Sequence, residues 1–211
     1  MYYSSIGVLA ILILFINNFS LLFRLPNKQL DDAHKAYRNF LITVAAFYIA
    51  DFLWSPLYIL NVKIINFIET SLYFVIMALS VLFLTKYIIL YLNEKNRFAK
   101  LLSFIGYFFL IAQVIVLLIN CFIPIAFWFE EDGSYHTSIA RNINLAAQIF
   151  MLILVEFQMI RIIRKTKGNI KRRHIAIAVF GIDMIIFIAL QGLCYGQWKY
   201  DNFRLLQTRM Q

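Results

Sequence analysis

The stretch NFIETSLYFVIMALSVLFLTKYIILYL, which runs from Asn66 to Leu92, decides the fold class of this chain. Glu69 and Lys86 are the only charged residues in it. The hydrocarbon core of a bilayer is about 30 Å thick, and a helix of about 20 mostly apolar residues crosses it. The stretch therefore predicts a helix that spans a membrane.

Five other apolar stretches of similar length occur in the 211 residues. The chain is 62% hydrophobic and 15% charged, with a mean hydropathy of +0.75, which is far from the balance of a soluble protein. We therefore predict an all-α integral membrane helical bundle of six transmembrane helices, formed by residues 1–195 as one domain. The predicted spans run from about Ser5 to Phe23, Phe40 to Leu60, Asn66 to Leu92, Leu101 to Ile123, Ile139 to Ile160 and Ile175 to Leu193.

Lysine and arginine lie almost entirely in alternate loops. Residues 24–38 carry four of them, residues 95–100 carry three and residues 161–173 carry seven. In contrast, Lys63 is alone in the second loop, and residues 125–137 have none. Basic flanks tend to stay in the cytoplasm. The pattern therefore predicts a multi-pass membrane protein with its amino terminus outside.

The net charge of +9 has an explanation that needs no nucleic acid. The basic residues form short clusters beside the spans, which the anionic inner leaflet attracts. The three histidines, His34, His136 and His174, have no close ligand spacing, and neither a Gly-x-Ser-x-Gly motif nor a phosphate-binding glycine loop occurs. We therefore expect no enzyme activity, metal, cofactor or nucleic-acid partner, and we expect the lipid bilayer as a partner.

Ionisable residues inside spans mark candidate functional positions, because each costs roughly 2.5–3.5 kcal/mol to insert. Asp51 and Asp183 are predicted near mid-depth. Their open roles are hydrogen bonding within the bundle, a switch or ligand sensor, and a transported proton or ion. Lys86 is expected either to pair with Glu156, at similar depth, or to extend to the headgroups. Glu69 lies near the outer end of its span, where we expect ordinary solvation.

Trp54 joins these candidates because it lies one turn after Asp51, in the segment DFLWSP that ends at Pro56. Proline has no backbone N–H to donate to the preceding turn. Pro56 is therefore predicted to open the helix backbone and to let the helix flex.

The fourth loop reads FWFEEDGSYHT from Phe127 to Thr137. Asp-Gly between two aromatic runs predicts a small extracellular β-hairpin between spans four and five, because that turn needs positive φ values. A plain interfacial turn is the alternative. In a hairpin, the aromatic side chains would lean onto the helix ends. The candidate ligand-contacting residues of this loop are Trp128, Glu130, Glu131, Asp132, Tyr135 and His136.

Two features toward the end of the chain stay open. Cys121 and Cys194 both fall near predicted outer ends of spans, either as a disulfide or as two unlinked residues. Residues 196–211 form a polar tail with three basic residues, which six spans would place outside. Either the tail is an exception to the charge rule or a further span is missing.

Four segments share a recognisable pattern: AYRNF (Ala36 to Phe40), YIADFLW (Tyr48 to Trp54), YIILYLNEK (Tyr87 to Lys95) and FWFEEDGSYH (Phe127 to His136). Together they resemble the amino-terminal membrane region of a clostridial (Firmicutes) family of GGDEF diguanylate cyclases. The resemblance covers roughly residues 1–190, and the aromatic-acidic loop ending in Asp-Gly-x-Tyr-His is its most specific part. In that family, about seven spans precede a cytoplasmic GGDEF domain.

The resemblance implies a sensory input module in the bacterial cell membrane, of the cyclic-di-GMP signalling type. The chain departs from the family after about Leu190, because neither a seventh span nor a GGDEF domain follows. A truncated or frameshifted product and a stand-alone sensor both fit this departure, and residues 196–211 are then either disordered or derived from the truncation. The expected partners are an unknown small ligand or envelope signal, a cytoplasmic output domain and a second copy of the chain.

Two other classes of function remain open. A small transporter or proton-coupled carrier is typically built from internal repeats and interrupted helices. Here, no convincing repeat occurs, and Pro56 is the only proline within a span. A structural membrane subunit would use the basic residues 161–173 to dock an acidic partner, although topology and lipid contact also explain that cluster.

Overall fold

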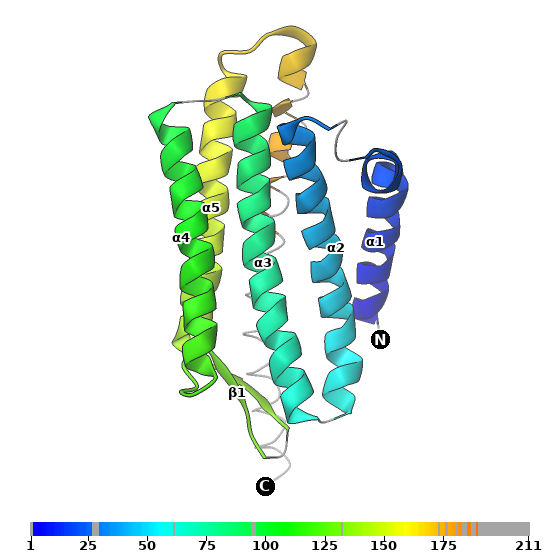
Figure 1. Cartoon of the computed structure of the whole chain (residues 1–211), viewed down its shortest axis with the longest axis vertical. Coiled ribbons are helices and arrows are strands. Elements are labelled where there is room, and N and C mark those ends of the chain that lie inside the picture. Colours follow the sequence, from blue (N-terminus) through cyan, green and yellow to red (C-terminus); the bar gives the residue numbers. More distant parts are fainter. Residues whose placement is uncertain are drawn as a thin grey trace, which may run out of the picture. The chain divides into compact units, whose positions relative to one another are not determined.

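The computed structural model is mostly helical, with a small β-hairpin at the lower end of α3 and α4 in the view of Figure 1. The residues that it describes are 2–26, 30–60, 62–93, 96–131, 133–172, 174–175, 177–179, 181–182, 185–186 and 189. The elements are α1 (Tyr2–Phe19), the π-helix η1 (Ser20–Arg24), α2 (Asp32–Ile59), α3 (Lys63–Tyr91), α4 (Arg97–Asn120), β1 (Phe127–Phe129), β2 (Tyr135–Thr137) and α5 (Ile139–Ile163).

Four of these helices are long and apolar enough to cross a membrane, namely α2 over Asp32–Trp54, α3, α4 and α5. A shorter apolar helix covers Ile11–Arg24. Each coincides with a predicted span, which confirms the helical, membrane-type fold. The sixth predicted span and Cys194 lie mostly or wholly outside the described residues, so the count of six spans and the state of the cysteine pair stay predictions.

The chain divides into two compact units, Met1–Arg141 and Asn142–Gln211. Helices α1 to α4 and both strands belong to the first unit, and most of α5 belongs to the second. The predicted domain limit at residue 195 lies outside the described residues.

Helix α2 begins at Asp32, well before the predicted start near Phe40. The backbone N–H of His34 donates to Asp31 Oδ1 at 2.7 Å, and this hydrogen bond lowers the pKa of the Asp31 carboxyl. A side-chain acceptor just before a helix satisfies one of the N–H groups that the first turn leaves unpaired. The first turns of α2 are therefore helical although they are too polar for the bilayer core.

Helix α1 is interrupted at Asn18, whose backbone leaves the helical region at φ −118° and ψ 17°. Its side-chain Nδ2 donates to the carbonyl of Leu14 at 3.0 Å. Asparagine side chains compete in this way for backbone groups. The chain then continues as the π-helix η1, which is wider than a regular α-helix and ends at Arg24.

Helices α2 and α3 are antiparallel neighbours, because only a short turn separates Ile59 from Lys63. Figure 1 shows them side by side along their length. Pro56 lies within α2, and the helix continues through it, with the N–H of Leu60 donating to the Pro56 carbonyl at 3.2 Å. The predicted opening of the backbone at Pro56 therefore does not end the helix.

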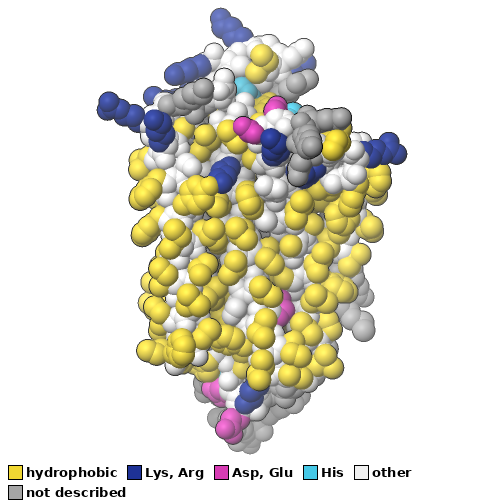
Figure 2. All heavy atoms as spheres, viewed as in Figure 1, with side chains coloured by type: hydrophobic (Ala, Val, Ile, Leu, Met, Phe, Trp, Pro, Cys, Tyr) yellow, Lys and Arg dark blue, Asp and Glu magenta, His cyan; other side chains and the backbone are white. Residues whose placement is uncertain are grey.

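The surface of the first unit is apolar across its middle. Figure 2 shows hydrophobic side chains covering α2, α3 and α4, with Lys and Arg gathered toward one end. Such a surface suits lipid tails as the surrounding solvent, because hydrocarbon imposes no cost on exposed apolar groups. Exposed apolar residues of α4 include Leu101, Phe104, Phe108, Ile111, Ile115 and Leu118.

The loop after α4 forms the predicted hairpin. Strands β1 and β2 pair antiparallel, with Phe127 opposite Thr137 and Phe129 opposite Tyr135. The N–H of Gly133 donates to the Glu130 carbonyl at 3.1 Å, and Gly133 has the positive φ of 84° that glycine adopts without strain. The hairpin is therefore confirmed over the plain turn.

Asn120, at the end of α4, fastens this hairpin to the helices. Its Oδ1 accepts hydrogen bonds from the N–H of Ala126 at 2.7 Å and of Phe127 at 3.3 Å, and its Nδ2 donates to the Phe127 carbonyl at 3.0 Å. The side chain thus pairs with the backbone before and within β1 much as a neighbouring strand would. Phe127 is fully buried and packs in one cluster with Phe74 and Met77 of α3.

Replacing Asn120 by alanine is expected to release the hairpin, because two N–H groups and one carbonyl lose their buried partner. The expected cost is about 2 to 4 kcal/mol of unfolding free energy. Hydrogen–deuterium exchange in detergent should show faster exchange over residues 126–138. Asn142→Ala, at an exposed position of α5, is the matched control and should leave this exchange unchanged. Unchanged exchange in Asn120→Ala would contradict the clamp.

Candidate functional site

The hairpin has two faces, because directly opposed residues of an antiparallel pair share a face and neighbours along a strand alternate. Phe127, Phe129 and Tyr135 share the face toward the helices. The Phe127 ring lies 5.1 Å from that of Phe67 in α3, and the Tyr135 ring lies 6.1 Å from that of Trp54 in α2, between centroids. One face of the hairpin therefore contacts both α2 and α3, as the predicted leaning of its aromatic residues implied.

The opposite face carries Trp128 and His136, which are paired in register. Their rings stack with centroids 5.4 Å apart and planes 14° apart. His136 Nε2 lies 3.2 Å from Glu130 Oε1 and 3.1 Å from Ser134 Oγ. Three predicted loop candidates thus form one partly exposed group of an indole, an imidazole and a carboxylate.

The remaining loop candidates are placed differently. Tyr135 belongs to the face that contacts the helices, so it links the hairpin to Trp54 rather than facing outward. Glu131 is exposed at the hairpin tip. Asp132 lies outside the described residues.

Asp51 and Glu69 form an acidic pair close to the hairpin end of the first unit. At 1.5 Å of rise per residue, Asp51 lies about 12 Å before the end of α2, and Glu69 lies about 9 Å after the start of α3. The two residues are therefore at similar depth on antiparallel neighbours, toward the same end of the helix pair. Asp51 had been a sequence candidate, whereas Glu69 had not.

The expectation that Glu69 is ordinarily solvated is wrong. Its side chain is 7% exposed, and neither carboxylate oxygen has a hydrogen-bond partner of good geometry among the described residues. The reason is that other parts of the fold cover this side of α3, which no pattern within the single span could reveal.

Two further buried polar residues share this face of α3. Asn66 and Thr70 lie one turn apart at either side of Glu69 and are 3% and 4% exposed. The Nδ2 of Asn66 and the Oγ1 of Thr70 lack well-formed hydrogen bonds within the described part of the chain. Buried polar groups normally have partners. A polar patch with unused hydrogen-bonding capacity therefore lies beneath the hairpin.

Lys86 lies nearer the opposite end of α3 from this patch. Its ammonium is 4.5 Å from the ring centroid of Tyr107 in α4 and 5.9 Å from that of Phe83. A cation over an aromatic face is favourable in a poorly hydrated setting. Lys86 thus has an aromatic partner within the first unit, and its pairing with Glu156 stays a prediction.

Glu156 is in the second unit, where its carboxylate fills the space that a Cβ on residue 181 would need. Only glycine therefore fits at Gly181 without moving Glu156. Asp183, the last of the intramembrane candidates, lies outside the described residues.

No cluster of three or more His, Cys, Asp or Glu side chains suited to a metal occurs among the described residues. Comparison with protein-family models, with curated proteins and with solved structures finds no match to this chain. The hairpin, the polar patch beneath it and the sequence resemblance are therefore the features that bear on function.

Replacing Glu69 by glutamine is expected to raise the free energy of unfolding by about 1 to 3 kcal/mol, because it removes a buried charge beside a like charge. The gain should shrink in an Asp51→Asn background, where the neighbouring charge is already gone. Equilibrium unfolding in mixed detergent micelles measures both. Glu131→Gln is the exposed control and should change nothing. Lower stability in Glu69→Gln, or equal gains in both backgrounds, would count against the pair.

Proposed function

We propose that this chain is a membrane-embedded input module of a bacterial signal-transduction protein of the cyclic-di-GMP type, without a catalytic domain of its own. In this proposal the amino terminus and the hairpin are outside, and the hairpin responds to a small ligand or envelope signal. The resemblance of the four segments to the diguanylate cyclase family supports the type of pathway. The orientation is supported by the distribution of lysine and arginine among the loops.

One observation carries the proposal: the two faces of the hairpin have different tasks. Trp128, His136 and Glu130 form a group on one face, and Phe127 and Tyr135 on the other face contact α3 and α2. A ligand bound on the first face changes the position of the second, because both belong to the same short strands. Movement of the hairpin therefore reaches the outer ends of two spans.

The polar patch under the hairpin is a physical reason why α2 and α3 could adopt two arrangements of similar free energy. Asp51 and Glu69 repel each other while both are charged, and Asn66 and Thr70 retain unused hydrogen-bonding capacity. A ligand shifts such a bundle only by the difference in its affinity for the two arrangements. Buried groups whose pairing is incomplete keep the free-energy difference between the two helix arrangements small enough for a ligand to overcome.

The decisive experiment joins the full chain, through the last span of a family cyclase, to that enzyme's GGDEF domain. We expect Asp51→Asn and Tyr135→Leu each to change cellular cyclic-di-GMP severalfold, because they alter the patch and its contact with the hairpin. Phe122→Leu, at a position 88% exposed beside the hairpin, is the aromatic control and should leave the level unchanged. Western blotting of membrane fractions checks that each variant inserts equally.

An unchanged level of cyclic-di-GMP in both Asp51→Asn and Tyr135→Leu, at equal insertion, would remove the hairpin and the patch from the mechanism. An equal change in Phe122→Leu would show that the output responds to any disturbance near the outer surface. Either result contradicts the proposed role.

A proton-coupled carrier is the second candidate, and the acidic pair is the observation that favours it. No ion pair to Asp51 or Glu69 occurs among the described residues, and protonation removes the cost of a carboxylate charge within a span. A carrier predicts proton movement into proteoliposomes that contain the purified chain, followed with a pH-sensitive dye. Asp51→Asn should abolish it. If the unaltered chain moves no protons under an imposed substrate or pH gradient, the carrier is contradicted. The input module is then the remaining candidate function.

A further inference from the structure

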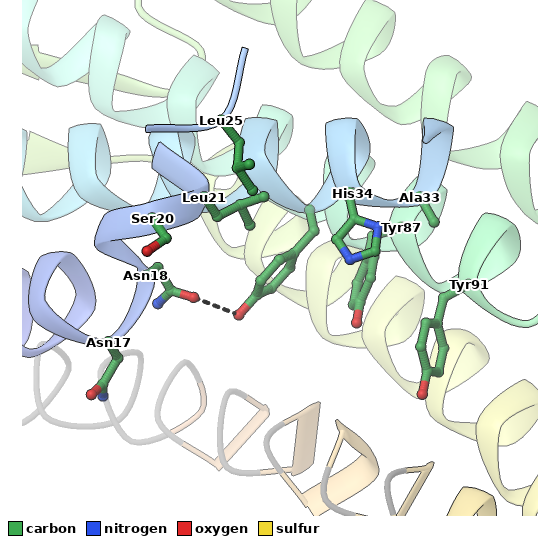
Figure 3. A pocket seen from close by; sticks show the side chains of 10 residues that line it. Asn17, Asn18, Ser20, Leu21, Leu25, Ala33, His34, Tyr87 and Tyr91 are labelled. Carbon is green, nitrogen blue, oxygen red and sulfur yellow. Dashed lines mark hydrogen bonds between the residues drawn. The ribbon is translucent and has the colours of Figure 1, made fainter. Parts of the chain in front are cut away.

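A pocket of about 400 Å³ lies at the end of the first unit that is away from the hairpin. Figure 3 shows its walls: Asn17, Asn18 and Ser20 come from the kinked end of α1 and from η1, and the facing side chains come from α2 and α3. The pocket therefore exists because α1 does not continue as a regular helix past Asn18. No sequence motif indicated it.

Three tyrosines form the facing wall. The Tyr37 and Tyr87 rings lie 4.8 Å apart, and those of Tyr87 and Tyr91 lie 5.5 Å apart, between centroids. The Tyr37 hydroxyl donates to Asn18 Oδ1 at 3.3 Å, which ties this wall to α1. Figure 3 shows the hydroxyls of Tyr87 and Tyr91 pointing the same way. The row thus offers hydroxyl groups along one edge and ring faces along its length.

The rest of the lining divides into polar and apolar parts. Asn17, Ser20 and His34 provide amide, hydroxyl and imidazole groups, and Leu21 and Leu25 provide apolar surface. A ligand that fills this pocket must therefore have a hydrogen-bonding part joined to an apolar part.

The charge around the pocket is mainly positive. Arg38 donates from Nη1 to the carbonyl of Leu25, which lines the pocket, at 3.0 Å. Arg24 closes η1, with its guanidinium 5.4 Å from the centre of the Phe19 ring. Asp31 and Asp32 are the nearby acids, and each has a partner: His34 lies 2.7 Å from Asp31, and Lys35 lies 3.1 Å from Asp32. An anionic ligand is therefore favoured over a cationic one.

We propose that this pocket binds the phosphate-bearing headgroup of an anionic phospholipid from the leaflet that meets the basic end of the first unit. The amide, hydroxyl and imidazole groups hydrogen-bond the phosphate and glycerol oxygens, and Arg38 supplies the charge that selects an anion. Leu21, Leu25 and the tyrosine rings pack against the start of the acyl chains. Basic pockets between spans on the cytoplasmic side are the usual sites of anionic headgroups.

Free phosphate esters share the chemistry of this headgroup, and the apolar part of the lining distinguishes the two sources. A lipid gains from Leu21 and Leu25, whereas a soluble phosphate ester does not. The proposal therefore commits to the lipid and leaves the free ester as an outcome that the experiment separates.

The test is native mass spectrometry of the full-length chain in detergent, titrated with phosphatidylglycerol. Phosphatidylcholine with the same acyl chains and free glycerol phosphate are titrated in parallel. We expect one phosphatidylglycerol to bind at least about tenfold more tightly than either, which is the effect of one charge-assisted contact. Equal binding of phosphatidylcholine overturns the choice of an anion, and equal binding of glycerol phosphate overturns the lipid.

Variants locate the bound lipid. Arg38→Gln is expected to weaken phosphatidylglycerol binding about tenfold, and Tyr87→Phe, which keeps the ring and removes only the hydroxyl, about threefold. Lys100→Gln removes a basic residue of α4, a helix that contributes no residue to the pocket lining, and should change affinity less than twofold. Circular dichroism and thermal unfolding verify that all variants remain folded. Equal losses in Arg38→Gln and Lys100→Gln, or no loss in folded Tyr87→Phe, would overturn the assignment.

Discussion

The arrangement of the hairpin end of the first unit depends on the hydrogen bonds of Asn120. A hairpin of two three-residue strands is too small to be stable alone. The Asn120 side chain pairs with the backbone of Ala126 and Phe127, so the strand begins at the point where Phe127 enters its apolar cluster. Those contacts place Tyr135 against Trp54 and leave Trp128 on the other face. A single buried amide thereby orients the residues on which the proposed sensing depends.

The second constraint is that the half-buried Asp51 and the buried Glu69 lie at similar depth. Charges in a low-dielectric interior need a counter-charge, a proton or water. The helices that hold them are joined by a turn too short to let them slide apart, so the electrostatic cost cannot be relieved locally. Both proposed functions depend on this electrostatic cost. In an input module it keeps two helix arrangements close in free energy, and in a carrier it favours the binding of a proton.

The two ends of the first unit have different chemistry because the membrane imposes different neighbours on them. Aromatic and acidic groups gather at the hairpin, and arginine, lysine and a tyrosine row gather at the far end of α3. The irregular end of α1 lies at the far end of α3, where it opens the pocket. The proposed signal at the hairpin and the proposed lipid at the pocket would therefore act on the same pair of helices, α2 and α3.

The sequence by itself determined the membrane class, the position of five helices and the hairpin at Asp-Gly. These follow from local apolar length and from the positive φ of Gly133, which need no distant contact. It also marked Asp51, Trp54 and Trp128. Only the tertiary structure decided the burial of Glu69, the clamp by Asn120 and the pocket beside Asn18. Each of these depends on which helix covers which face. A polar residue near the end of a span has the same sequence pattern whether a neighbouring helix or water covers it.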